Sequence, residues 1–442
     1  MNLNKKISLL LLLSCCIAFQ SFGQTADSLV SKYRRQALDY NQEVRSAQYS
    51  SEAASEIKAS SKADFKPKVS ANGFYQWRDN PYQLTVPSLT GMESRTVKGN
   101  DQQYGASVQV VQPLYTGGAI KQKYEMLKED EIISEFNVDR VKNNILLETD
   151  QVYWMAVGQQ EIAGIFDEYY QAIDQLVKVV EQRVEVGTVS RNDLLMVEVK
   201  QNEIEYLRQE AQTNSRISEM ALNQQVGVPL EEKPMLDNAI PQIIWTDIAE
   251  DWTHIALNQR AEISMADHEV LKSEKGEKLA MAKYNMQVMA QLEGSYGLPG
   301  YDLTNQSPDE NVVAGVSVKV PIFEWGKRKH DRKAAKLDTE VQKQKLSQVS
   351  DKIALEVQSN YFALQQANER VALSYGSLDK AEENLKMMND RYKEGVASIL
   401  EVLDAHMYWQ QAKINYTEAK LNAKNSESAF KRSTGSLLKE MD

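Results

Sequence analysis

The fold is decided by the stretch Arg391-Tyr-Lys-Glu-Gly-Val-Ala-Ser-Ile-Leu-Glu-Val-Leu-Asp-Ala405, which lies between two long helical patterns. An earlier stretch, Arg183-Val-Glu-Val-Gly-Thr-Val-Ser-Arg-Asn-Asp-Leu-Leu195, has the same form, with its glycine 208 residues earlier. The same spacing relates Pro113 to Pro321 and Gly227 to Gly435. A constant spacing kept over this distance indicates an internal repeat.

Each stretch predicts a tight turn between two helices. A glycine that tolerates left-handed backbone ends the first helix, and a serine then caps the second helix with an acid three residues later, the spacing of a capping box. The residues are Gly187, Ser190 and Asp193 in the first turn, and Gly395, Ser398 and Glu401 in the second.

The N-terminus predicts export from the cytoplasm. Residues 1–23 have the charged start, the apolar core and the small-x-small cleavage site (Ser21-Phe-Gly23) of a signal peptide. Both cysteines lie inside it, so the mature chain is expected to have no disulfide and no cysteine-bound metal. Lipidation of Cys15 instead of cleavage after Gly23 stays open. The net charge of −11 argues against nucleic acid as a partner.

Four segments alternate between apolar and polar residues, as strands with two different faces do. They cover residues of about 68–78, 103–112, 287–297 and 311–320, and Pro113 and Pro321 mark the junctions between strand and helix. The polar stretch between the first two segments is expected to be a long loop. After residue 23, no apolar run reaches the ~18 residues of a transmembrane helix. About ten residues, however, suffice for a tilted membrane-spanning strand.

The repeats predict the domain organisation. The first repeat covers 24–226 and the second covers 253–435, with a mid-height equatorial element at 227–252 and a tail at 436–442. Each repeat starts with a helix (28–64 and 254–286) and, after its strands, has a long helix (118–186 and 326–394) and a short one (190–226 and 398–433). Each long helix would measure about 100 Å.

Spanning strands must close into a barrel, because lipid cannot satisfy the open edge of a sheet. Four strands are too few to enclose a useful lumen, so several copies are expected to share one barrel. We therefore predict an α+β membrane protein with two internal repeats, a trimeric 12-strand outer-membrane β-barrel continued by a long periplasmic α-helical barrel. A periplasmic coiled-coil scaffold is the alternative, although it leaves the strands unexplained. No enzyme activity, cofactor or metal is expected.

Two further motifs carry a family resemblance: Gln112-Pro-Leu-Tyr-Thr-Gly-Gly118 and its repeat Val320-Pro-Ile-Phe-Glu-Trp-Gly326. With the two turns, they make the chain resemble the TolC family of outer-membrane efflux proteins, the outer membrane factors. The resemblance implies a homotrimer in the outer membrane with a large periplasmic part. It also implies a duct for efflux or secretion, joined to a periplasmic adaptor (membrane fusion) protein and an inner-membrane pump of RND or ABC type. The substrate cannot be read from the sequence.

The resemblance also implies a gate at the periplasmic helix tips. Glu401 and Asp404 correspond to carboxylates that ring the constriction. Tyr392 corresponds to a tyrosine of the network that holds the tips shut, and Asp193 to its acidic partner. Ala397 stands where some relatives have an arginine, and whether Arg191 replaces it is open. The adaptor is expected to dock at the turns that contain Gly187, Ser190, Gly395 and Ser398.

The carboxylates have two interpretations. Threefold symmetry would turn each into a ring, which selects ions by sign and raises the pKa of each carboxyl through crowding. Alternatively, both are ordinary acids in a first helical turn, where they favour the helix dipole. The basic run Lys327–Lys333 opposes its helix dipole, so outer-membrane lipid phosphates are a candidate partner, with a solvated charge run as the alternative.

Overall fold

The structure is a computed structural model that describes residues 29–87, 94–241, 251–300 and 307–441. The expected signal peptide and Cys15 lie outside the described residues, as does part of the expected element at 227–252. The described chain forms two compact units. The first comprises the residues up to 48 together with 137–263 and 349–442, and the second comprises 49–136 and 264–348. Each unit therefore takes segments from both sequence repeats.

The order of elements repeats along the chain. The first half contains α2 (Leu29–Tyr40), α3 (Gln42–Ser61), a short 3-10 helix (Lys62–Phe65), β1 (Lys68–Trp77), β2 (Gln83–Val86), β3 (Arg95–Lys98), β4 (Gln102–Thr116), α4 (Ala119–Glu185) and α5 (Arg191–Val226). The second half contains α6 (Trp252–Gln259), α7 (Ala261–Ala282), β5 (Gln287–Leu298), β6 (Asp309–Lys319), α8 (Lys327–Lys393), α9 (Ile399–Thr434) and α10 (Ser436–Lys439). The long helices and the strands of the sheet confirm the periodicities seen in the sequence.

Three local predictions were wrong. The helix expected over 28–64 is interrupted at Asn41, because the Asn41 side chain caps a new helix by accepting from the backbone N–H of Glu43 at 2.8 Å. The loop expected after β1 contains the hairpin β2–β3, whose four-residue strands are too short to show a period. The helix expected over 254–286 is broken between α6 and α7.

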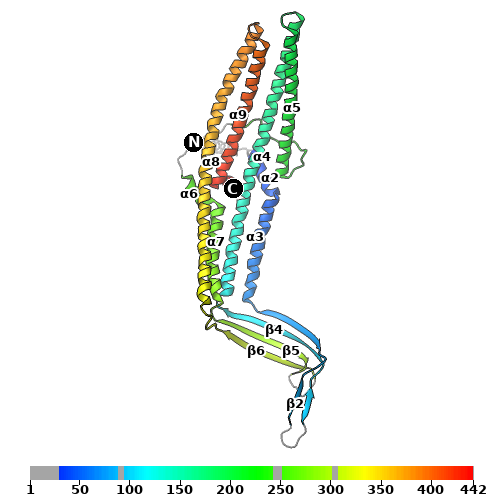
Figure 1. Ribbon diagram of the computed structural model, residues 1–442, viewed down its shortest axis with the longest axis vertical. Helices are drawn as coiled ribbons and strands as arrows, with labels where there is room; N and C mark the ends of the chain where they lie inside the picture. The colour runs from blue at the N-terminus through cyan, green and yellow to red at the C-terminus, as the bar shows by residue number, and fades with distance from the viewer. Residues whose placement is uncertain (1–28, 88–93, 242–250, 301–306, 442) are drawn as a thin grey trace, which may run out of the picture. The chain divides into compact units, whose positions relative to one another are not determined.

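Four strands form one antiparallel sheet in the order β1-β4-β5-β6, in which β4, β5 and β6 can be followed side by side (Figure 1). The register aligns Ala71 with Val108, and Val108 with Gly294. Because side chains alternate along a strand, this register gathers the apolar positions of all four strands on one face. That face is uncovered by the described residues: Val312 is 73% exposed and Val316 is 65% exposed. The strands β1 and β6 each pair on one side only within this sheet.

β4 continues beyond its expected end at Pro113. Its pairing with β5 runs to Thr116 and shifts register between Pro113 and Tyr115. A proline has no N–H to give to a ladder, so a bulge at this point lets the strand continue. β6, in contrast, ends at Lys319, just before Pro321.

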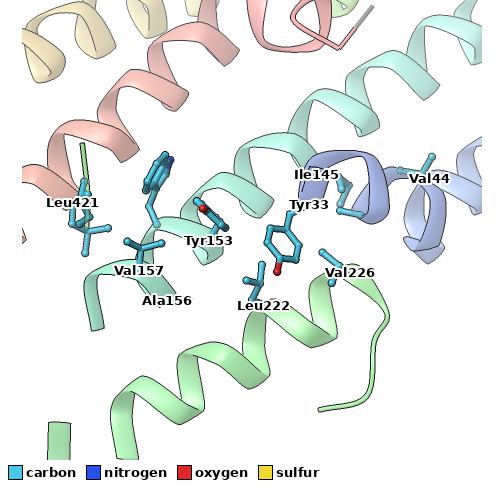
Figure 2. Packing of buried hydrophobic residues seen from close by; sticks show 12 residues of the cluster. Tyr33, Val44, Ile145, Tyr153, Ala156, Val157, Leu222, Val226 and Leu421 are labelled. Carbon is cyan, nitrogen blue, oxygen red and sulfur yellow. The ribbon is translucent and has the colours of Figure 1, made fainter. Parts of the chain in front are cut away.

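The first unit is held together by a core that several helices share. Tyr33 of α2, Tyr153 of α4 and Leu222 of α5 lie together in this core, as Figure 2 shows. Beside it, the Arg34 guanidinium and the Asp150 carboxylate form a buried ion pair at 2.6 Å. Within the described residues, no helix is both long enough and apolar enough to span a membrane.

Candidate functional site at the helix tips

Two turns join the long helices to the short ones, α4 to α5 and α8 to α9. Gly187 and Gly395 have φ values of 77° and 75°, the left-handed region that side chains other than glycine rarely adopt. Both capping boxes are confirmed. The Asp193 carboxylate accepts from the Ser190 N–H at 3.0 Å, and the Glu401 carboxylate accepts from the Ser398 N–H at 2.7 Å. The turns are therefore built by local hydrogen bonds.

The capping role affects the chemistry of Glu401. Hydrogen bonds from the Ser398 backbone N–H and hydroxyl lower the pKa of the Glu401 carboxyl, and the nearby Arg391 lowers it further. This lowering of the Glu401 pKa within one chain is opposite to the rise that three neighbouring Glu401 carboxylates in a trimer would produce. Glu401 is thus held ionised by its own turn.

Asp404 differs from Glu401 because its carboxylate takes no part in a helix cap. It is exposed and forms no hydrogen bond or ion pair with any described residue. It lines a groove of about 400 Å³ between α5 and α9. The other lining residues are Leu195, Met196, Val199, Lys200, Glu203, Leu400, Leu403 and Met407. Lys200, the cation of this groove, is paired with Glu203 at 3.0 Å. The Asp404 carboxylate is therefore available to a ligand in the groove.

Tyr392 lies in the apolar core of the tips, and its hydroxyl is buried without a hydrogen-bond partner among the described residues. The Asp193 carboxylate, its expected partner, is occupied by the Ser190 cap. Burial raises the pKa of Tyr392, the Arg183 charge beside it lowers this pKa, and the Asp193 carboxylate is close enough to raise it. The single chain therefore does not contain the hydrogen bond that the resemblance implies between Tyr392 and Asp193.

A different residue, Arg183, ties the two tips together. Its guanidinium donates to the backbone carbonyls of Tyr392 at 3.0 Å and Lys393 at 3.1 Å. The guanidinium carbon also lies 4.5 Å from the centre of the Tyr392 ring. These carbonyls belong to the last turn of α8, where the helix dipole favours a cation, and the Tyr392 carbonyl also accepts from the Gly395 N–H at 3.0 Å. This role was not predicted from the sequence, although Arg183 is the repeat counterpart of Arg391, 208 residues later.

Arg191, in contrast, is exposed and makes no hydrogen bond or ion pair with any residue that the structure describes. Ala397, for which the resemblance implies the position of a gate arginine, is buried in the tip core. Among the described residues of the two turns, the hydrogen bonds from one turn to the other come from Arg183 at the end of α4.

The tip core also contains polar atoms without partners. The hydroxyls of Tyr169 and Tyr392 and the Nδ1 atom of His406 are buried and unpaired among the described residues. The His406 ring stacks on Tyr169 with ring centres 5.9 Å apart. Burial lowers the pKa of His406 to about 4. Because buried polar groups normally find partners, these three atoms have hydrogen-bonding capacity that the described residues leave unused.

No group of three His, Cys, Asp or Glu residues in the described ranges is arranged to hold a metal ion. The tips offer charged side chains, a groove and hydrogen bonds between two turns.

Comparisons with known proteins agree in family and in fold. A family model described as outer membrane efflux protein matches residues 33–228 and 252–436. No curated protein matches the chain. The structure is similar to the transmembrane channel protein CusC, with 17% identity and a TM-score of 0.77 over 93% of this chain and 92% of CusC.

Two further channels are similar. The outer membrane channel CmeC of Campylobacter jejuni has 17% identity and a TM-score of 0.72, over 92% of this chain and 86% of CmeC. The open state of the MtrE outer membrane channel of Neisseria gonorrhoeae has 18% identity and a TM-score of 0.73, over 92% of this chain and 89% of MtrE. At these identities, the likeness is one of fold.

Proposed function

Since the chain belongs to the outer membrane efflux protein family, we propose that three copies of it close one β-barrel and form a gated export duct. Membership makes the protein a channel of the outer membrane that serves tripartite efflux, with its helical part in the periplasm. The family is one of channels and not of enzymes. Assembly, gating and partners are the proposed part.

The sheet is the observation that carries the proposal. It presents one uncovered apolar face and leaves β1 and β6 unpaired on their outer sides within the described chain. In lipid, an open edge leaves backbone groups without partners, so each β6 is expected to pair with the β1 of a neighbouring copy. Three copies supply twelve strands. A periplasmic coiled-coil scaffold would explain the helices but gives this apolar face no role, so it is not favoured.

We infer that the helix tips form the periplasmic gate. Three copies would turn Glu401 and Asp404 into acidic rings, and charged rings at a narrow mouth select ions by sign. Tyr392 and Asp193 lie at the point where the two turns meet, and Arg183 holds that point together. We expect this tie between α4 and α8 to break when the gate opens.

The proposed partners rest on membership of the family and on the exposure of the two turns. A periplasmic adaptor protein is expected to dock at the turns of Gly187, Ser190, Gly395 and Ser398, which are exposed. An inner-membrane pump of RND or ABC type would supply the cargo, so the channel itself needs no energy source. Outer-membrane lipid surrounds the barrel.

The first experiment measures the mass of the protein extracted from membranes, corrected for bound detergent. We expect extraction to require detergent and to yield three times the mass of one chain, because the barrel is complete only with three sheets. A single chain that is released by salt or carbonate without detergent would contradict the channel and favour the scaffold.

A further inference from the structure

The segment that follows β6 carries an unusual concentration of positive charge. Six cations lie within ten residues: Lys327, Arg328, Lys329, Arg332, Lys333 and Lys336. The acid within this run, Asp331, is already occupied, since its carboxylate accepts from Lys283 and from the Tyr284 hydroxyl, both at 2.6 Å. These hydrogen bonds lower the pKa of Asp331. The protein therefore leaves most of this positive charge unbalanced.

The six cations have few partners. Arg332 lies 3.9 Å from Glu277, a long ion pair, and the other five form no ion pair with the described residues. Lys327, Arg328 and Lys329 also occupy the first turn of α8, where the helix dipole adds positive potential and disfavours further cations. An external anion would relieve both effects.

A groove beside the segment is suited to such an anion. Arg328, Arg332 and Lys336 recur every fourth residue along α8 and line a groove of about 630 Å³ with parts of α7 and the start of α4. Five cations and three acids line this groove, and Lys343 is neutralised by Glu340 at 3.0 Å. The side-chain oxygen of Gln122, also in the lining, is buried and unpaired among the described residues. It can accept a hydrogen bond from a hydroxyl.

The residues just before the segment point to a membrane surface as the source of the anion. Ile322, Phe323 and Trp325 are 94%, 70% and 90% exposed, and the rings of Phe323 and Trp325 contact each other edge to face. Exposed aromatic side chains are typical of the membrane–water interface. Clusters of Lys and Arg directly beside a membrane-spanning segment are typical of sites for anionic lipid headgroups.

We propose that residues 322–336, with the groove of Arg328, Arg332 and Lys336, bind the headgroup of an anionic phospholipid in the periplasmic leaflet. The aromatic residues lie at the membrane–water interface, the cations hold the phosphate, and Gln122 accepts from a headgroup hydroxyl. The inference rests on the proposed placement of the sheet in the outer membrane. The bound lipid would set the height of the barrel in the bilayer.

The test compares binding of tail-labelled phosphatidylglycerol and phosphatidylcholine to the full-length protein in a neutral detergent. We expect the protein to prefer phosphatidylglycerol. A cation at an anionic surface contributes roughly fivefold to affinity, so Arg328→Gln/Arg332→Gln/Lys336→Gln should lose about 100-fold. The matched control, Lys352→Gln/Arg370→Gln/Lys380→Gln, removes three exposed cations elsewhere on α8 and should keep the preference.

Each other outcome overturns the inference. Equal affinity for the two lipids, or an equal loss in both triple variants, would show that these residues do not form a headgroup site. Displacement of the lipid by millimolar inorganic phosphate would show that the groove is a site for free phosphate. Arg328→Lys/Arg332→Lys preserves the charge and should preserve the preference for phosphatidylglycerol. If the triple variant misfolds, loss of the preference in this double variant would contradict the inference. A wild-type trimer without lipid preference would overturn this inference and leave the channel intact.

Discussion

At the scale of single residues, Arg183 has the clearest function of those at the tips. Its two hydrogen bonds reach the last carbonyls of α8 from the last turn of α4. Within the described chain, no other arginine of the two turns forms hydrogen bonds from one turn to the other. Arg191 forms no hydrogen bond with any described residue. Control of opening is therefore expected to depend on Arg183 before any other cation of the turns.

Arg183→Ala should favour the open channel. Hydrogen bonds from a charged donor contribute about 2 kcal/mol, so losing the tie should shift the balance toward opening by roughly 30-fold if the tie exists only in the closed state. Single-channel conductance in planar bilayers measures the open fraction. Arg191→Ala is the control and should behave like the wild type; equal effects of the two substitutions would contradict the role of Arg183.

His406 should make the tips sensitive to acid. Its pKa is about 4 in the folded protein, against about 6.5 when it is free in water, because burial disfavours the imidazolium. Stability is thus complete above pH 6.5 and falls as the pH drops toward 4, by about 2 kcal/mol at pH 5. Unfolding measured at pH 7 and pH 5 should show this loss, and His406→Phe should reduce it. His254→Phe, at an exposed histidine, should leave it unchanged.

At the scale of elements, the sheet separates two environments on its two faces. Val316 of β6 pairs with Ala290 of β5 on the apolar face, and the adjacent Ser317 pairs with Met289 on the other face. Neighbouring positions of one strand are therefore expected to differ strongly in their tolerance of charge, which a soluble edge strand would not show.

Val316→Arg should impair insertion of the barrel, while Ser317→Arg should be tolerated. An arginine on the lipid face costs about 2–4 kcal/mol near the middle of the bilayer, whereas the lumen face accepts charge. The amount of trimer recovered from membranes in mild detergent measures the difference. If both substitutions reduced trimer yield equally, the assignment of the faces would be wrong.

At the scale of the whole molecule, the gate depends on repetition of one chain. A single Asp404 in one groove is an ordinary exposed carboxylate, since it has no partner among the described residues. Three Asp404 carboxylates at a narrow mouth would attract cations together, because protein walls of low dielectric constant concentrate their electric field in the opening.

Asp404→Asn should reduce the preference of the channel for cations by a fewfold, with the fold preserved because no described hydrogen bond is lost. Reversal potentials in a salt gradient measure this preference. Asp379→Asn removes the same charge from an exposed position on α8 and serves as the control. An unchanged reversal potential in Asp404→Asn would remove Asp404 from the constriction.

Much of the fold follows from short-range patterns. The period of two in β5 and the helical period of α4 predicted these elements to within a few residues, and the serines and acids of the turns predicted both capping boxes. Such features involve residues within a few positions of one another, so their physics is local. The break at Asn41 was missed because it depends on a single side chain within a helical pattern. The hairpin β2–β3 was missed because strands of four residues are too short to show a period.

The sequence by itself determined the helices, the strands, the caps and the repeat, because each depends on neighbours along the chain. Only the tertiary structure decided that the apolar positions of four strands share one face, that the Asp193 carboxylate forms no hydrogen bond with the Tyr392 hydroxyl, and that Arg183 reaches a turn 209 residues away. These outcomes depend on register and on competition between distant partners. The spacing of nearby residues encodes neither the register nor the choice of partner, because both are determined only when separate segments pack against each other.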